Sequence, residues 1–459
     1  MGETIKTAEC KEELDRMEEM TRRDHVLAIR EFLDKNNKGA IKSTVTNYLK
    51  VLRNDPLLTG CLRYNLLTCR VDVVKPLWWN RETVALSEEA IDYFYIYLER
   101  NYSLCNDKMM NRAIRGIANS NKYHPVRELL NSLQWDGIPR IRYMIKKYLG
   151  GDDSDLTYEC MLHFMLGAIR RVFVPGCKYE EMLCLVGGQG AGKSTFFRFL
   201  AIRDEWYSED LKKLNDEKVF EKLRGHWIIE MSEMIAAINA KGIEEIKSFL
   251  SRQKETYRIP YQQNEEDRPR QCVFAGTTNT KRFLPFDRSG ERRFLPVEVD
   301  QAKAEKHLLE DEAEARGYII QAWAEAMDIY KNREYSMKFP EDFQGQLELH
   351  RQKFMQEDTI SGLIQGWLDE YQGEYVCSQM IYKEALGHLD TPPKWATNEI
   401  CEIMDMKISG WREGPSHRFT KEGYGTQRSW IRSASGVNEE DPDGFRPLPE
   451  EGQLTLPFD

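Results

Sequence analysis

The sequence predicts an α/β protein with a mainly helical N-terminal region and a C-terminal module that resembles a winged helix. Short apolar runs alternate with helical patterns over residues 176–300, and one of these runs leads directly into a glycine-rich loop and an apolar helix. Near the C-terminus, two helical patterns precede a stretch rich in glycine and aromatic residues. Alternating strands and helices favour a parallel sheet, and two helices followed by a hairpin favour a winged helix.

The chain of 459 residues has room for about three domains, since one domain holds roughly 100–200 residues. In the N-terminal region, Ser87 opens an amphipathic pattern from Ala90 to Glu99, and Cys69 to Val74 is a short β-like stretch. Further helical patterns break at Pro125 and at Gly150. We expect six segments: a mixed, mostly helical domain (1–120), a helical lead-in (121–175), an α/β core (176–300), a helical segment (301–371), a winged-helix-like module (372–436) and a disordered acidic tail (437–459).

Composition and charge narrow the class of protein. No apolar run approaches the roughly 18 residues that span a bilayer, so we expect no membrane partner. Ten cysteines include no Cys-x-x-Cys pair, which favours free thiols in a reducing, cytoplasmic compartment. The net charge is −10, but residues 437–459 hold seven acids and one base. Because the acidity is concentrated in the tail, bulk charge does not exclude a nucleic-acid partner.

The clearest motif follows the apolar run from Met182 to Val186. It matches the phosphate-loop pattern, in which glycines let main-chain N–H groups approach phosphates at a helix N-terminus. Lys193 would reach the β- and γ-phosphates of ATP, and Ser194 would hold Mg²⁺. The alternative is a glycine turn that binds no nucleotide. The predicted nucleotide-binding residues are Gly187, Gly188, Gln189, Gly190, Ala191, Gly192, Lys193, Ser194 and Thr195.

Phosphoryl transfer also needs a carboxylate near the metal and a group that positions water. The next apolar run, Trp227 to Ile229, ends in Glu230 and Glu233. We expect one of these acids to act on Mg²⁺ and its waters and the other to polarise the attacking water, and we assign the metal role, beside Ser194, to Glu230. The alternative is a solvated strand end.

A third apolar run, Cys272 to Gly276, is followed by Asn279, which would act as a sensor of the γ-phosphate or the attacking water. Arg292 and Arg293 precede a further apolar run and suit sensor and finger roles. An arginine finger supplied by a neighbour raises the rate by about 10³- to 10⁵-fold. Such a finger implies a ring or at least a dimer. For Asn279, the alternative to a sensor is an asparagine that merely lies in a turn.

These motifs together resemble the virulence-associated protein E family, over about residues 60 to 430. The resemblance also rests on Asn121-Lys-Tyr-His-Pro-Val, Trp135-Asp-Gly-Ile-Pro-Arg, Pro175-Gly-Cys-Lys, Tyr257-Arg-Ile-Pro-Tyr and the Gly-x-Arg-Arg-Phe sequence that ends at Phe294. The family resembles superfamily 3 helicases of phages and mobile elements, which form AAA+-like hexameric rings on DNA. The resemblance therefore implies an AAA+-like P-loop ATPase core and a homo-oligomer in the cytoplasm of a bacterial host.

From this resemblance we expect an ATP-dependent DNA helicase or translocase that acts in the replication of a phage or mobile element. The alternative is a nucleotide-switched origin-binding initiator or helicase loader without processive unwinding. A small-molecule kinase is disfavoured because no acceptor-binding lid is evident. The chain before the P-loop is too short for a primase domain, so we expect no primer synthesis.

Two regions are candidates for DNA contact. In superfamily 3 relatives a hairpin before the sensor strand carries basic residues; here its tip, near residues 264–267, is acidic, and bases flank it. The second candidate is the wing, where Tyr424 and Trp430 would stack on bases; a solvated hairpin is the alternative. The predicted DNA-binding residues are Lys254, Arg258, Arg268 and Arg270 beside the tip, and Arg412, Arg418, Lys421 and Arg428 in the wing.

The last seven residues include three large apolar side chains, although the acidic tail that they end has no core in which to bury them. They resemble the peptides by which bacterial replication proteins dock in the sliding clamp. We expect residues 453–459 to bind that clamp through Gln453, Leu454, Leu456 and Phe458.

Overall fold

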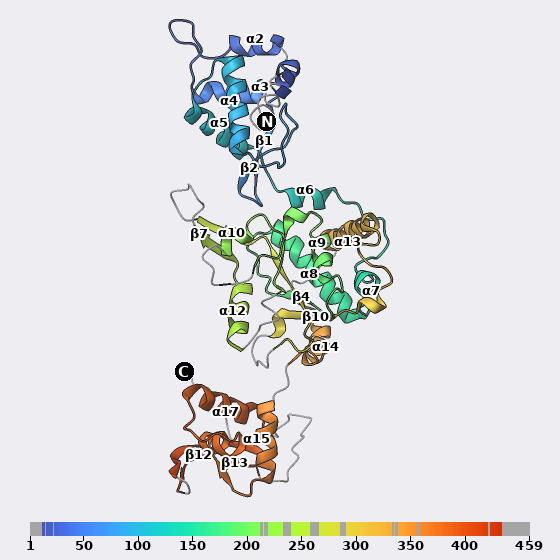
Figure 1. Ribbon diagram of the computed structural model, residues 1–459, viewed down its shortest axis with the longest axis vertical. Coiled ribbons are helices and arrows are strands. Elements are labelled where there is room, and N and C mark those ends of the chain that lie inside the picture. Colours follow the sequence, from blue (N-terminus) through green and yellow to red (C-terminus); the bar gives the residue numbers. More distant parts are fainter. Residues whose placement is uncertain are drawn as a thin grey trace, which may run out of the picture. The chain divides into compact units, whose positions relative to one another are not determined.

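The computed structural model divides the chain into two compact units, residues 1–356 and 357–459 (Figure 1). It describes residues 12–13, 15–21, 23–211, 214, 219–232, 240–257, 266–284, 291–332, 335, 338–355, 359–420 and 423–433. The predicted tail (437–459) lies outside these residues. Among the described helices, none has the length and apolar character required to cross a membrane.

The first unit begins with a small helical region built around a three-stranded sheet in the order β2-β1-β3. As predicted, Ser87 caps a helix, because its hydroxyl accepts a hydrogen bond from the main-chain N–H of Ala90. The core contains Trp78 stacked on Tyr97, with ring centroids 4.8 Å apart. The elements are α2 (Arg23–Glu31), α3 (Val45–Asn54), β1 (Leu62–Asn65), β2 (Arg70–Val73), α4 (Glu88–Tyr102), α5 (Asp107–Ser120) and β3 (Lys122–Tyr123).

Three helices lead into the central sheet: α6 (Pro125–Ser132), α7 (Met144–Leu149) and α8 (Asp155–Phe173). Pro125 starts α6 instead of breaking a helix, because the first helical position needs no N–H donor. Gly150 ends α7 with φ of 64°, a left-handed conformation that glycine adopts without strain. The break predicted at Gly150 is therefore confirmed.

The central described sheet has five parallel strands in the order β10-β4-β9-β6-β5, which confirms the predicted α/β fold. The apolar run Met182–Val186 forms β4, as predicted. In β4, Leu183 and Leu185 face one hydrophobic cluster, whereas Met182 and Val186 face another. Both faces of the sheet are thus covered. The remaining strands are β5 (Tyr207–Ser208), β6 (Ile228–Glu230), β9 (Val273–Thr278) and β10 (Phe294–Glu298).

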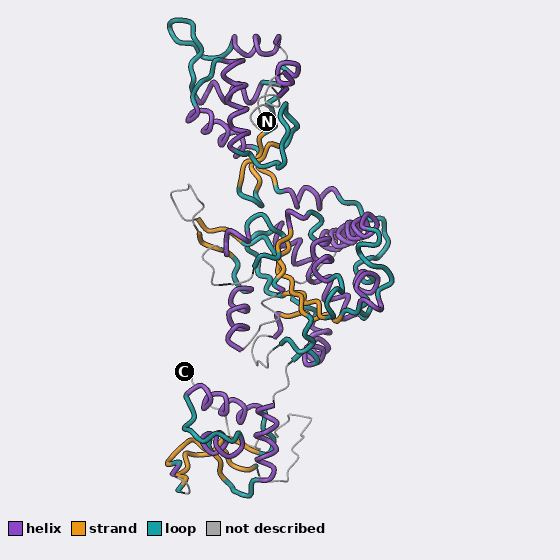
Figure 2. Tube along the Cα trace, viewed as in Figure 1, coloured by secondary structure: helices purple, strands orange, loops and turns teal. Residues whose placement is uncertain are grey.

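Helices cover the two faces of this sheet. In Figures 1 and 2, α8, α9 and α13 lie on one side of the strands, and α10 and α12 lie on the other. Trp227 and Trp323 anchor the first side, with ring centroids 4.4 Å apart. The elements are α9 (Lys193–Leu200), α10 (Val219–Leu223), α12 (Ala240–Leu250), α13 (Glu312–Asn332), α14 (Glu341–Gln352), short 3-10 turns η1 (Asp204–Trp206), η2 (Glu291–Arg293) and η3 (Gln301–Lys303), and a hairpin of β7 (Lys254–Tyr257) and β8 (Glu266–Pro269).

The second unit packs helices against a three-stranded antiparallel sheet in the order β11-β13-β12. The predicted hairpin is present, and Trp430, which belongs to one of its two strands, is buried. The helix predicted from Ser378 to Leu389 is shorter, because the chain turns at Gly387, whose φ is 73°. The elements are α15 (Thr359–Glu370), β11 (Tyr375–Val376), α16 (Ser378–Met380), a π-helical turn η4 (Ile381–Ala385), α17 (Lys394–Met406), β12 (Trp411–Phe419) and β13 (Gly425–Arg432).

Candidate nucleotide-binding site

The glycine loop connects the end of β4 to the start of α9, at the carboxyl edge of the sheet. Gly192 precedes α9 with φ of 76°, a conformation that a residue with a Cβ adopts only under strain. The unpaired N–H groups of the first turn of α9 favour an anion at this point. A pocket of about 530 Å³ opens over the loop and is lined by residues 189–195, Ser232, residues 277–279, His307 and Leu309.

Lys193 is held in place by three acceptors. Its ammonium donates to the carbonyls of Gly187 and Gly188, at 2.8 and 2.7 Å, and to Oδ1 of Asn279, at 2.9 Å. The residue is only 7% exposed. Burial lowers the pKa of Lys193 from its ordinary 10.5, and the nearby Glu230 carboxylate opposes that effect. The structure therefore brings the predicted lysine and the predicted sensor into direct contact.

Glu230 is the buried acid of the site, with 1% of its surface exposed. Oγ of Ser194 donates to Glu230 Oε1 at 2.8 Å, and the Thr277 hydroxyl donates to the same oxygen. The Tyr207 hydroxyl donates to Oε2. Burial and the charge of Glu230 raise the pKa of Tyr207 well above its usual range, so this phenol stays protonated as a donor.

The parallel sheet explains why these residues meet. β9 lies between β4 and β6, and the carboxyl ends of all three strands share one edge. Of the predicted site residues, Lys193, Ser194, Glu230 and Asn279 come together there. Glu233 lies outside the described residues.

Sequence reasoning missed Thr277 and Tyr207 as partners of Glu230. Thr277 ends a strand beside Asn279, and this position was a usable signal. Tyr207 lies on the two-residue strand β5, which has no recognisable pattern.

A second pocket, of about 490 Å³, lies on the other side of the glycine loop. Asn279 lines both pockets, and residues 150–152, 186–188 and 298–300 line the second one. At Gly150 an added Cβ would stand 2.0 Å from the Asp300 carbonyl, so only glycine fits there. The glycine pair that the sequence marks as a helix break therefore also packs against the end of β10.

Arg292 and Arg293 lie at the opposite, amino edge of the sheet. β10 begins at Phe294, which pairs with Met182 at the start of β4. From Met182 to Val186, where the glycine loop begins, β4 runs four residue steps, or about 13 Å. Arg293 is 15% exposed and is held by Glu180 at 3.1 Å and Ser251 at 2.9 Å. Arg292 is 71% exposed and lies 3.7 Å from Glu180. The structure does not bring either arginine to the glycine loop of its own chain.

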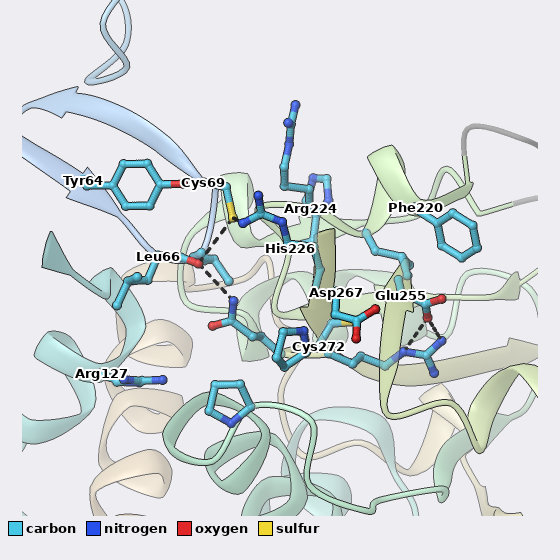
Figure 3. Close-up of a pocket in the computed structure, with 17 residues that line it drawn as sticks. Tyr64, Leu66, Cys69, Arg127, Phe220, Arg224, His226, Glu255, Asp267 and Cys272 are labelled. Atoms are coloured by element: carbon cyan, nitrogen blue, oxygen red, sulfur yellow. Dashed lines mark hydrogen bonds and ion pairs between the residues drawn. The ribbon is translucent and has the colours of Figure 1, made fainter. Parts of the chain in front are cut away.

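The base of the β7–β8 hairpin borders a smaller pocket of about 250 Å³ (Figure 3). Arg270 is 3% exposed, pairs with Glu255 and donates to the Phe249 carbonyl at 2.7 Å. Its charge therefore stabilises the fold, and the prediction that Arg270 contacts DNA is wrong. Arg268 contacts Sγ of Cys69 at 3.3 Å, and Lys254 pairs with Asp267. Arg258 lies outside the described residues.

Residues that line this pocket connect the base of the hairpin to the N-terminal region. The Gln271 amide donates to the Leu66 carbonyl at 3.0 Å, and its Oε1 lies 2.8 Å from Nε2 of His124. Burial lowers the pKa of His124 to about 4, so this imidazole is neutral near pH 7 and donates through Nε2. Figure 3 shows Leu66 and Cys69 facing Cys272 and Glu255 across this pocket.

The predicted wing residues are arranged differently from the expectation. Arg412 and Arg418 are exposed, whereas Arg428 pairs with Asp405 and Glu413, both at 3.0 Å. Trp430 and Tyr424 are buried, so the prediction that they stack on bases is wrong. Their aromatic rings belong to the hydrophobic clusters of this small unit instead. Lys421 and the tail residues Gln453, Leu454, Leu456 and Phe458 lie outside the described residues.

A parallel sheet covered on both faces, with a lysine-bearing glycine loop after one strand and a carboxylate at the end of another, defines a P-loop ATPase. No curated protein matches the chain. Residues 130–356 match the Virulence-associated protein E-like domain, so the chain carries a domain of this family, as its motifs predict.

Two solved structures of an NrS-1 C-terminal region are similar to this chain. The apo structure of residues 305–718 is 13% identical with a TM-score of 0.44, and the match covers 81% of this chain and 96% of that one. The A form apo structure of the same residues is 13% identical with a TM-score of 0.40, and the match covers 66% and 78%.

Proposed function

We propose that this protein is an ATP-dependent DNA helicase or translocase that acts in the replication of a phage or mobile element. The observation that carries the proposal is the cluster of Lys193, Ser194, Glu230 and Asn279 at one edge of a parallel sheet, inside a Virulence-associated protein E-like domain. The core is of the AAA+ type, and the second unit is a winged-helix-like module.

The donors at this edge fit ATP and Mg²⁺. Main-chain N–H groups of residues 188–194 and the Lys193 ammonium would bind the terminal phosphates. The Ser194 hydroxyl and the Glu230 carboxylate, already 2.8 Å apart, are the hard oxygen ligands that Mg²⁺ prefers. Bound there, the ion would neutralise charge on the phosphates. Asn279 would hold Lys193 and orient the attacking water, and Thr277 and Tyr207 would fix the Glu230 carboxylate.

The arginines support an oligomer, most simply a hexameric ring. Arg292 lies about 13 Å of strand away from the glycine loop of its own chain and is 71% exposed. It is therefore better placed to reach the site of a neighbouring subunit. Arg293, tethered to Glu180 and Ser251, would position the turn that carries Arg292.

DNA would contact Lys254 and Arg268 near the hairpin and Arg412 and Arg418 on the wing. The acidic tail would recruit the bacterial sliding clamp through residues 453–459. Deleting those residues and measuring clamp binding by calorimetry tests this part, and unchanged affinity would remove it.

Replacing Lys193 by alanine tests the proposal. The Lys193→Ala variant should lose ATP hydrolysis by at least about 10²-fold, because the lysine charge on the phosphates is gone. Its thermal unfolding should stay close to that of the parent. Lys331→Ala, at an exposed position in α13, is the matched control. Equal turnover in Lys193→Ala and parent would sink the assignment.

A nucleotide-switched initiator or loader is the second candidate, since a winged-helix-like unit also suits origin binding. Strand displacement separates the two functions, because opening each base-pair step costs about 1.4 kcal/mol on average. A helicase should displace the strand of a long forked duplex with ATP. A loader should hydrolyse ATP and leave that duplex intact.

A further inference from the structure

Helix α5 of the N-terminal region carries a row of basic residues on its exposed face. The segment 108–122 contains four bases and no acid, in a chain whose net charge is −10. The three bases within α5 recur at spacings of four and three residues, which places them on one side of the helix. The members of this row, the α5 stripe, are Lys108, Arg112 and Arg115 on α5 and Lys122 on the strand β3 that follows it, and all four are exposed.

The other side of α5 fixes the stripe in place. Met110, Ala113, Ile114, Ile117 and Ala118 are buried against α3 and β1. Asn106 caps the helix by accepting from the main-chain N–H of Met109. The three helical bases are therefore preorganised along about 10 Å of the helix, given a rise of 1.5 Å per residue.

The stripe also lacks internal neutralisation. Within the described part of the chain, no carboxylate lies within ion-pair distance of Lys108, Arg112 or Arg115. Three bases elsewhere in this region do have an acidic partner: Lys50 pairs with Asp34, Arg63 with Glu128 and Arg100 with Glu18. A solvated helix face normally mixes both signs of charge, so a row of one sign favours an anionic partner.

We propose that the α5 stripe binds the sugar–phosphate backbone of duplex DNA without sequence preference. Lys, Arg, Asn and Ser side chains make most phosphate contacts, and residues 108–122 supply these types. That segment contains no aromatic residue, so it offers no platform for stacking single-stranded bases. A row of cations along one helix face matches one backbone of a duplex. This contact is separate from ATP hydrolysis and from the hairpin and wing residues.

Binding of a fluorescent duplex of mixed sequence to the full chain, without nucleotide, tests the proposal by anisotropy over a series of salt concentrations. Arg112→Glu/Arg115→Glu should bind at least about tenfold more weakly, and its log-log salt slope should fall by about 1.8, or 0.9 per phosphate contact. Lys35→Glu/Lys38→Glu, in the exposed loop between α2 and α3, makes the same charge change off the stripe and should bind within about twofold of the parent. Arg112→Lys/Arg115→Lys should restore most of the affinity, since a lysine also binds phosphate.

Three outcomes would overturn the proposal. Equal losses in both charge-reversed pairs would indicate a bulk charge effect, and unchanged affinity in the stripe pair would show that it contacts no DNA. A loss confined to single-stranded DNA would also contradict the duplex assignment. If circular dichroism shows that the glutamate pair is unfolded, Arg112→Gln/Arg115→Gln takes its place with the same expected direction. A parent that binds duplex through the stripe but hydrolyses no ATP would refute the proposed function and leave this inference standing.

Discussion

The two edges of the central sheet are built from opposite kinds of contact. At the carboxyl edge, Lys193 and Glu230 are buried and each is held by several partners from separate segments of the chain. At the amino edge, Arg293 is tethered but Arg292 extends into solvent. One edge is complete within a single chain, whereas at the other the Arg292 guanidinium is 71% exposed and pairs with Glu180 only at 3.7 Å. The difference favours an assembly in which the amino edge of one subunit meets the carboxyl edge of the next.

The largest expected effect tests the amino edge. Arg292→Ala should lower ATP turnover by about 10³- to 10⁵-fold, the contribution of an arginine finger. Mixing Arg292→Ala with Lys193→Ala subunits should restore part of the turnover, because a mixed interface pairs an intact loop with an intact arginine. No recovery at any mixing ratio would break the comparison between the edges.

Arg293→Ala is the matched variant at the same edge. It should reduce the free energy of unfolding by about 1–3 kcal/mol, because Glu180 loses its nearest partner. A melting temperature equal to that of the parent would show that Arg293 is not the structural member of the pair.

The next effect tests the carboxyl edge. Glu230→Gln should lower ATP turnover by about 10²- to 10⁴-fold, as for loss of a catalytic carboxylate, while an ATP analogue still binds. The amide cannot accept all the hydrogen bonds that the carboxylate receives from Ser194, Thr277 and Tyr207. Glu221→Gln, at an exposed glutamate of α10, should retain parental turnover. Full activity of Glu230→Gln would remove this acid from the site.

The smallest effect concerns pH. The charged form of Lys193 binds phosphates, and burial lowers its pKa, so the proton is lost at a lower pH than the ordinary 10.5. Affinity for an ATP analogue should therefore fall as alkaline pH passes that lowered pKa, by at most about tenfold per pH unit. Lys193→Arg should show no such fall, because arginine stays charged. Identical profiles for the two proteins would contradict the lysine contact.

The local part of this site could be predicted from sequence because its signals are local. The run from Met182 to Val186 forms the predicted strand, and the loop after it has a fixed spacing of glycines and lysine. The meeting of Glu230 and Asn279 followed from a general property, since parallel strands end at one edge.

Contacts that depend on tertiary packing could not be predicted. All five residues of β4 are apolar, so their division between two cores has no signature in the sequence. Arg270 was expected to contact DNA because it flanks the hairpin tip in the sequence, but Glu255 on the neighbouring strand neutralises it in the interior. Tyr207 reaches Glu230 only because a two-residue strand completes the sheet.

Gln271 links the N-terminal region to the central sheet through its side chain. It directly precedes Cys272 and the sensor strand β9, and its side chain grips both the Leu66 carbonyl and His124. These two hydrogen bonds therefore connect the N-terminal region directly to the strand that precedes Asn279. If β9 moves during ATP hydrolysis, these contacts would move the N-terminal region with it. A duplex bound to that region would then move as well.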